Sequence, residues 1–173
     1  MAVLDIVLYP DAPLLDKAEP YDAVDEAVNQ LAHDMVETMF AYDGVGLAGP
    51  QVGISKRIFV MAEPGKSPRC LVNPEILERE GREEGEEGCL SLPQIYAEKV
   101  TRAAWVKVRA LDERGHAVEF EAEGLGARII QHEYDHLDGI CFPDRLDIIS
   151  RESTIQDWME LRRQMMEQAG QRG

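Results

Sequence analysis

The sequence has few cysteines, no excess of basic residues and no long apolar run, and each absence excludes a class of protein. The three cysteines, Cys70, Cys89 and Cys141, lie far apart without a CxxC pair, which argues against a disulfide framework and for a reducing compartment. Acidic residues outnumber basic ones by 33 to 18, so the surface repels phosphate backbones and no direct nucleic-acid substrate is expected. No apolar run approaches the roughly 20 residues of a membrane-spanning helix. No secretory signal is recognised at the first residues, and we expect a soluble, cytoplasmic protein without membrane contact.

The residues that are present have the balance of an ordinary globular protein. Apolar residues make up 45% and charged residues 29% of the 173 residues, which fits one domain over residues 1–173 with its own core. Apolar positions recur every three or four residues in three segments, which predicts helices over residues 23–42, 125–137 and 151–168. The third helix has a loosely apolar side formed by Ile155, Trp158, Met159, Leu161 and Met165.

Strands are predicted between these helices. Residues 57–62 form an apolar run typical of a buried strand, and the alternation over residues 103–111 and 117–122 predicts a β-hairpin. Two shorter strands are expected at 70–72 and 75–80, and the acidic residues 82–87 separate them from the segment around Cys89. Helices mixed with hairpin-linked strands indicate an α+β domain.

The segment after the first helix is rich in glycine. Gly44 is expected to adopt the left-handed conformation that ends this helix. Residues 44–53 hold four glycines, too many for a stable helix or a central strand. Close backbone approach is possible along such a segment.

The strongest chemical signal is His132-Glu133-Tyr134-Asp135-His136, an HExxH sequence. On a helix, two histidines four residues apart share a face and can bind one metal ion. Glu133 lies roughly 100° around the helix from His132, where a carboxylate can act as general base without binding the ion. The apolar neighbours of this segment argue against a surface helix, so we predict a metallohydrolase.

The third metal ligand is not fixed by this motif. Phe142 stands where the HExxHxxGxxH pattern would require a histidine, which excludes that class. A glutamate further downstream, such as Glu160 on the last helix, is one alternative. A cysteine is the other, and Cys89 suits it better than Cys70 or Cys141, which lie in apolar segments typical of core packing.

Three segments together resemble the peptide deformylase family: residues 44–51 (GVGLAGPQ), residues 87–91 (EGCLS) and the HExxH segment. Their order and intervals agree with that family as well, and the similarity extends from about residue 5 to residue 148. The resemblance implies a single domain in which mostly antiparallel sheets pack around a central HExxH helix, with a helix at the C-terminus. It implies hydrolysis of the N-formyl group from N-formylmethionyl nascent peptides, with release of formate.

The resemblance also implies roles for individual residues. It assigns Cys89, His132 and His136 as ligands of one divalent ion, usually Fe(II), with zinc, nickel or cobalt as alternatives. It assigns Glu133 as the acid and base, and the Gln51 amide and the Leu90 N–H as the donors that stabilise the oxyanion. A transient contact with the ribosome is expected from the resemblance, because the family's substrate emerges there.

The substrate is expected to lie along the glycine-rich segment as an added strand. Gly46 would pair with its backbone, and the methionine pocket would be lined by Val45, Leu125 and Ile129. We further expect Glu87 to pair with Arg102 and so to orient the loop that carries Cys89.

Three positions depart from the family pattern. Gly49 stands where alanine is common, which should only loosen the loop. Tyr96 stands where many bacterial members have arginine, so the resemblance carries over no substrate contact there. Arg128 lies near the side-chain pocket at a position that is often apolar, which leaves the selectivity of that pocket open.

Three rival functions remain distinguishable. A metallopeptidase that uses Glu160 would keep its metal after Cys89→Ser. A hydrolase with Cys89 as nucleophile would survive chelators and be inactivated by thiol alkylation. A metal-stabilised interaction module would have a closed four-ligand site without exchangeable water.

Overall fold

A computed structural model of the chain describes residues 2–172. Five strands form one antiparallel sheet in the order β1–β2–β3–β6–β7, and two more form a separate hairpin. The sheet strands are β1 (Gly46–Ala48), β2 (Ile58–Met61), β3 (Arg69–Glu80), β6 (Trp105–Leu111) and β7 (Ala117–Glu123). The hairpin strands are β4 (Glu83–Cys89) and β5 (Leu92–Arg102). The helices are α1 (Glu26–Ala41), α2 (Gly124–Leu137) and α3 (Ile148–Gln171), with short 3₁₀ helices η1 (Gly49–Val52) and η2 (Phe142–Arg145).

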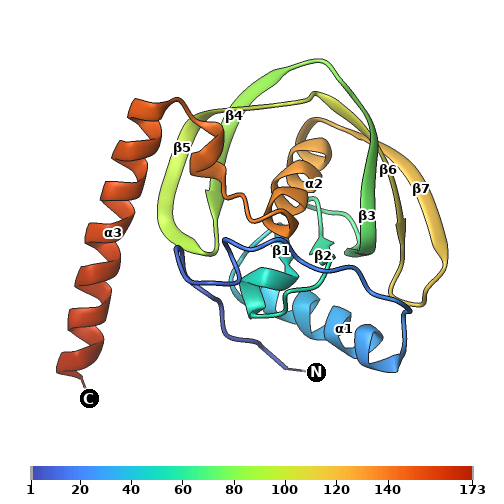
Figure 1. The fold of residues 1–173 in the computed structure, drawn as a ribbon, viewed down its shortest axis with the longest axis horizontal. Coiled ribbons are helices and arrows are strands. Elements are labelled where there is room, and N and C mark those ends of the chain that lie inside the picture. Colours follow the sequence, from blue (N-terminus) through green and yellow to red (C-terminus); the bar gives the residue numbers. More distant parts are fainter. Residues whose placement is uncertain (1, 173) are drawn as a thin grey trace.

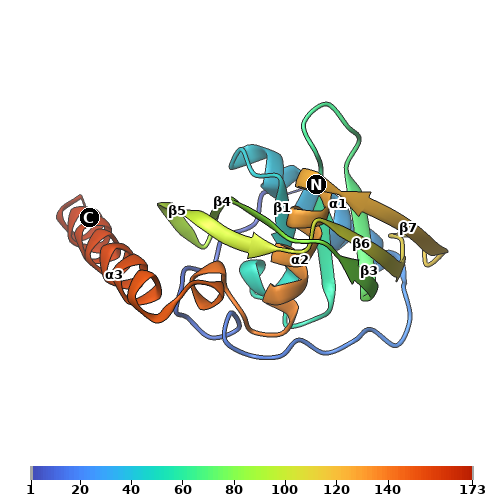
Figure 2. The same ribbon diagram turned by 90° about the horizontal axis from the view of Figure 1, so that it is seen from above.

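Strand β2 explains why two helices cover opposite faces of the sheet. Its side chains alternate, so Ile58 and Val60 pack with α1, whereas Phe59 and Met61 pack with α2. Figures 1 and 2 show α2 in the middle of the molecule, between the sheet and the β4–β5 hairpin. The predicted α+β fold with a central HExxH helix is therefore confirmed.

Helix α3 lies beside β5 at the edge of the molecule (Figure 1). The fully buried Trp158 anchors it, and its indole Nε1 donates a hydrogen bond to the Tyr9 carbonyl at 2.8 Å. The helix starts three residues before the predicted position because Asp147 caps it by accepting from the Ser150 N–H. Met159 does not belong to the packed side, since it is 43% exposed.

Several local predictions were wrong. The acidic residues 83–87 do not form a separating loop but belong to β4, whose partner β5 was not predicted. Residues 70–72 and 75–80 are one strand, β3, which continues through a bulge at Asn73. The glycine-rich segment does agree with its prediction, since its strand β1 is three residues long and lies at the edge of the sheet, not in its centre.

The end of α1 also differs from the prediction. Asp43, not Gly44, has the left-handed conformation, with φ of 56°, which aspartate tolerates better than most residues. A Cβ at position 44 would lie 2.9 Å from Cδ1 of Leu90, so any larger residue there would require the Leu90 side chain to shift.

No helix within residues 2–172 combines the length and apolar character needed to cross a bilayer.

Candidate metal centre

Helix α2 carries three of the predicted site residues on one buried face. His132, Glu133 and His136 are each at most 8% exposed. The helix is held in this orientation because Ala127, Ile130 and Leu137 pack against the sheet. A histidine or carboxylate buried in this way needs a polar partner or a metal ion.

Strand β4 brings Cys89 to the two histidines. Its Sγ lies 3.3 Å from Nε2 of His136, and one ligand atom from each of Cys89, His132 and His136 lies within 4.8 Å of the others. A thiolate and two imidazoles are suitable donors for a divalent transition metal, and three protein ligands leave a position for water or substrate. The residues present therefore fit a catalytic metal ion.

Each histidine has a partner at its other ring nitrogen. Nδ1 of His132 lies 2.7 Å from Oε1 of Glu87, and Nδ1 of His136 lies 3.8 Å from Sγ of Cys141. Such contacts fix the ring orientation and leave Nε2 for a metal ion. Burial and the neighbouring His132 lower the pKa of His136, which favours the neutral imidazole that binds metals.

Glu87 and Arg102 lie together in a buried ion-pair network. Arg102 donates from Nε and Nη2 to the two carboxylate oxygens of Glu87, both at 2.9 Å. Its Nη1 donates to Asp135 on α2, which also accepts two hydrogen bonds from Arg145. Burial alone would raise the pKa of Glu87, but the hydrogen bonds from Arg102 and His132 outweigh it and hold this pKa well below its usual range. Glu87 is therefore a fixed carboxylate behind His132.

Glu133 has the environment of a proton acceptor. Burial raises its pKa to about 7, while a cation at the adjacent donors would favour the carboxylate. Within residues 2–172, its Oε2 is buried without a hydrogen-bond partner. Its Oε1 lies 3.8 Å from Nε2 of His132. A carboxylate so placed can accept a proton from a water molecule at the metal site.

Gly46 allows β1 to pass close to this carboxylate. A Cβ at position 46 would lie 2.6 Å from Oε1 of Glu133. We expect Gly46→Ala to displace Glu133 and to lower kcat/KM on the order of 100-fold, because small misplacements of a reacting group carry such costs. Steady-state rates of the purified variant test this. Gly170→Ala is the control, since a Cβ there meets nothing within 4 Å; wild-type rates for Gly46→Ala would contradict the expectation.

Gln51 lies beside Cys89 with a fixed amide. Its Oε1 accepts from the Ala48 N–H at 2.9 Å, so Nε2 faces Sγ of Cys89 at 3.3 Å and Oγ of Ser91 at 3.2 Å. Leu90 follows Cys89 and lies in the wall of the same cavity. Two N–H donors near one metal site can stabilise an oxyanion.

A cavity of about 920 Å³ opens onto these residues. Its wall includes all four predicted substrate-binding residues, Val45, Gly46, Leu125 and Ile129. Val45 and Leu125 are 41% and 47% exposed, as expected of apolar side chains that contact a ligand when it binds. Tyr96 and Arg128 also line this cavity.

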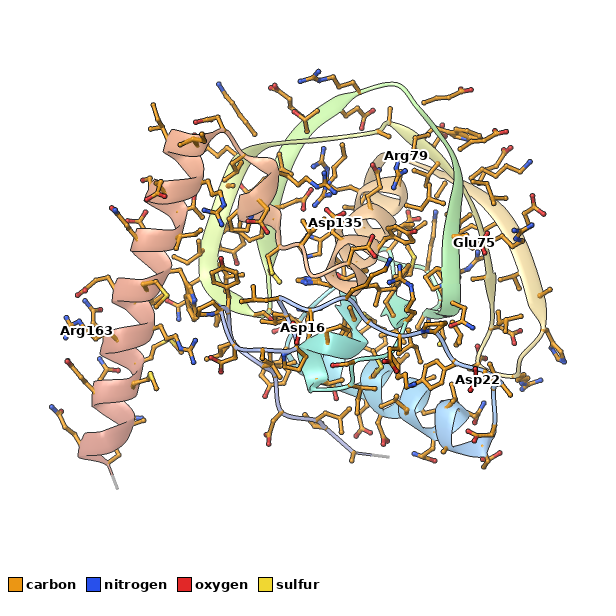
Figure 3. The ribbon with its side chains drawn as sticks, in the orientation of Figure 1. Asp16, Asp22, Glu75, Arg79, Asp135 and Arg163 are labelled. Carbon is orange, nitrogen blue, oxygen red and sulfur yellow. The ribbon has the colours of Figure 1, made fainter. Side chains whose placement is uncertain are left out.

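Glu160 is not part of the cluster. It lies on α3 with a side chain that is 55% exposed, and it pairs with Arg163. Figure 3 shows Arg163 on the far side of α3, whereas Asp135 of α2 lies near the centre of the molecule. The arrangement does not support a metallopeptidase that uses Glu160 as its third ligand.

Sequence reasoning missed three contributors to the site. Asp135 holds Arg102, Ser91 holds the Gln51 amide, and Met165 of α3 reaches the cavity wall. Asp135 could have been found, because an aspartate on the buried face of a helix requires a cationic partner. Met165 carries no such signal.

Comparison with known proteins gives a consistent result. A family model described as polypeptide deformylase matches residues 3–152. A peptide deformylase from Alkalilimnicola ehrlichii is 51% identical over 154 residues, which cover 87% of this chain and 86% of that protein. The structure of a Thermus thermophilus peptide deformylase is similar with a TM-score of 0.84 and 47% identity, covering 90% of this chain and 92% of that one. A Legionella pneumophila peptide deformylase has a TM-score of 0.89 and 40% identity, covering 95% and 98%.

Proposed function

This chain belongs to the polypeptide deformylase family, and we propose that Cys89, His132 and His136 hold its catalytic metal ion. It is a metal-dependent hydrolase that removes the N-formyl group from nascent polypeptides. The observation that supports the ligand assignment is the group of three donor atoms within 4.8 Å of one another. We propose Fe(II) as the native ion, with zinc, nickel or cobalt able to occupy the same donors, because this mixed thiolate and imidazole set suits all four.

In the proposed mechanism, the metal ion and the residues around it have different chemical roles. When bound, the ion supplies Lewis acidity, which lowers the pKa of water to about 7 and polarises a carbonyl. Glu133 accepts a proton from the attacking water and returns it to the amine nitrogen of the peptide. The water oxygen bonds to the formyl carbon, the C–N bond breaks, and formate leaves.

We propose that two donors of this chain stabilise the charge that develops on the formyl oxygen. The Gln51 amide is held by Ala48 and Ser91, so it need not reorganise during the reaction. The N–H of Leu90 is the second proposed donor. One such donor typically contributes roughly 3 kcal/mol to the stability of the transition state.

The substrate peptide is proposed to extend the sheet at β1. This strand is an edge strand paired only with β2, so its other side can accept a peptide backbone. The methionine side chain would enter the cavity between Val45, Leu125 and Ile129. The formamide and the peptide backbone would then lie beside Glu133, because Gly46 of β1 is adjacent to the Glu133 carboxylate.

The cellular setting of the enzyme follows from its substrate. We propose that residues 1–173 serve as one catalytic domain in the cytoplasm and meet formylated peptides during a transient ribosome contact. Helix α3 packs on the domain through the hydrogen bond from Trp158 to the Tyr9 carbonyl, and its exposed side is the surface proposed for this contact.

The decisive experiment measures formate release from a formyl-Met tripeptide by protein prepared anaerobically with Fe(II). We expect a chelator to lower the rate by more than about 100-fold, since Lewis acidity contributes several kcal/mol. Added Fe(II) or Ni(II) should restore the rate. Activity that survives the chelator and disappears on thiol alkylation would instead identify a cysteine hydrolase.

A further inference from the structure

Arg128 joins α2 to both strands of the β4–β5 hairpin. It lies one helical turn before His132, and its side chain is only 12% exposed. Nη1 donates to Oε2 of Glu87 at 2.7 Å and to the Val100 carbonyl at 2.8 Å, and Nη2 donates to the Glu83 carbonyl at 3.1 Å. A guanidinium with three acceptors on two strands is a rigid link, because its donors point in fixed directions.

Gly85 provides the space for this link. A Cβ at position 85 would lie 3.0 Å from Cζ and Nη2 of Arg128. The register of β4 against β5 also shifts between Gly85 and Glu87, so the hairpin bends where the guanidinium crosses it. Arg128 and Gly85 therefore depend on each other.

Arg128 also shares the carboxylate behind His132. Oε2 of Glu87 accepts from Nε of Arg102 and from Nη1 of Arg128, while Oε1 accepts from Arg102 and contacts Nδ1 of His132. The same hairpin carries Cys89, and the same helix carries His132 and His136. Any movement of the hairpin away from α2 would separate the sulfur from the two imidazoles.

We propose that Arg128 is a positioning residue that holds the Cys89 hairpin against α2 and so keeps the three metal donors together. This role rests on the proposed ligand set. A residue that only lined the pocket would affect substrate binding. Loss of the hydrogen bonds of Arg128 should instead affect metal retention more strongly than substrate binding. Substitution of groups that orient metal ligands typically costs 10- to 100-fold in metal affinity.

The test uses the Co(II)-loaded enzyme and follows the thiolate-to-cobalt absorption while a chelator removes the ion. We expect Arg128→Leu to release Co(II) about tenfold faster than wild type, with faster hydrogen exchange of the β4 and β5 amides. Arg128→Lys keeps the charge but can reach only part of the acceptor set. Its rate of Co(II) release should therefore lie between those of wild type and Arg128→Leu. KM for a formyl-Met tripeptide should change less than the release rate.

Gly85→Ala provides a second, independent variant. Alone, its methyl group displaces the guanidinium and should accelerate Co(II) release. In the Arg128→Leu background the same methyl group has no guanidinium to displace, so it should add nothing further, giving a non-additive double-mutant cycle.

Three outcomes overturn the proposal. Release rates and amide exchange equal to wild type in Arg128→Leu, with only KM changed, would make Arg128 a pocket wall residue. Additive effects of Arg128→Leu and Gly85→Ala would show that the two positions act separately. Absence of the thiolate-to-cobalt absorption in the wild-type protein would overturn the ligand set itself, and the role of Arg128 with it.

Discussion

Replacing Glu133 with glutamine is expected to lower kcat for formate release by about 1000-fold, within the usual range for a general acid–base residue. Glutamine has nearly the same shape but cannot accept the proton of the attacking water. Because Glu133 is not one of the three proposed donors, the variant should still bind one divalent ion per chain. The measurement is the rate of formate release together with the metal content of the same sample.

Glu84→Gln is the matched control for this substitution. Glu84 is exposed on β4 and does not line the cavity, so the identical chemical change there should leave kcat within about twofold of wild type. If Glu133→Gln lost its metal ion together with its activity, Glu133 would be a ligand and the assignment of the base would fail.

Local signals in the sequence were sufficient to predict the helix that carries this chemistry. The apolar positions of α2 face the sheet at helical spacing, and the HExxH histidines therefore share its other face. The hairpin β6–β7 was predictable for a similar reason, since its alternation matches a sheet with one exposed face.

The hairpin β4–β5 could not be predicted from local pattern. Its first strand, Glu83–Cys89, consists mostly of glutamate and glycine, which are depleted in strands. What holds it is remote in sequence, because Glu87 pairs with Arg102 and Arg128. These contacts and the backbone pairing with β5 arise in the folded structure and leave no signal in the local sequence of β4.

The prediction of the metal donors was limited for the same reason, because the third donor lies far from the two histidines in the sequence. The two histidines follow from one motif, whereas the choice between Cys89 and Glu160 needed the resemblance to a family. The structure separates these alternatives through position alone, since Cys89 lies 3.3 Å from His136 and Glu160 pairs with Arg163 at the surface.

Replacing Cys89 with alanine should remove the metal ion and abolish deformylation. Cys89 is one of the three proposed protein donors, and loss of a donor costs more than the 10- to 100-fold in affinity typical of residues that merely orient one. We therefore expect metal affinity to fall by more than about 100-fold and activity to fall with it. Added metal at high concentration should recover only part of the rate, because the remaining imidazoles hold the ion loosely.

Cys70→Ala is the control that separates metal binding from the loss of a buried thiol. Cys70 is buried in the core between α1 and the sheet, so its removal costs stability through a small cavity but should leave one ion per chain. For Cys70→Ala we expect a lower melting temperature with unchanged metal content. For Cys89→Ala we expect the metal content to fall. Should the Cys89→Ala protein bind its ion as tightly as wild type, the sulfur is not a ligand, and the three-donor site would have to be abandoned.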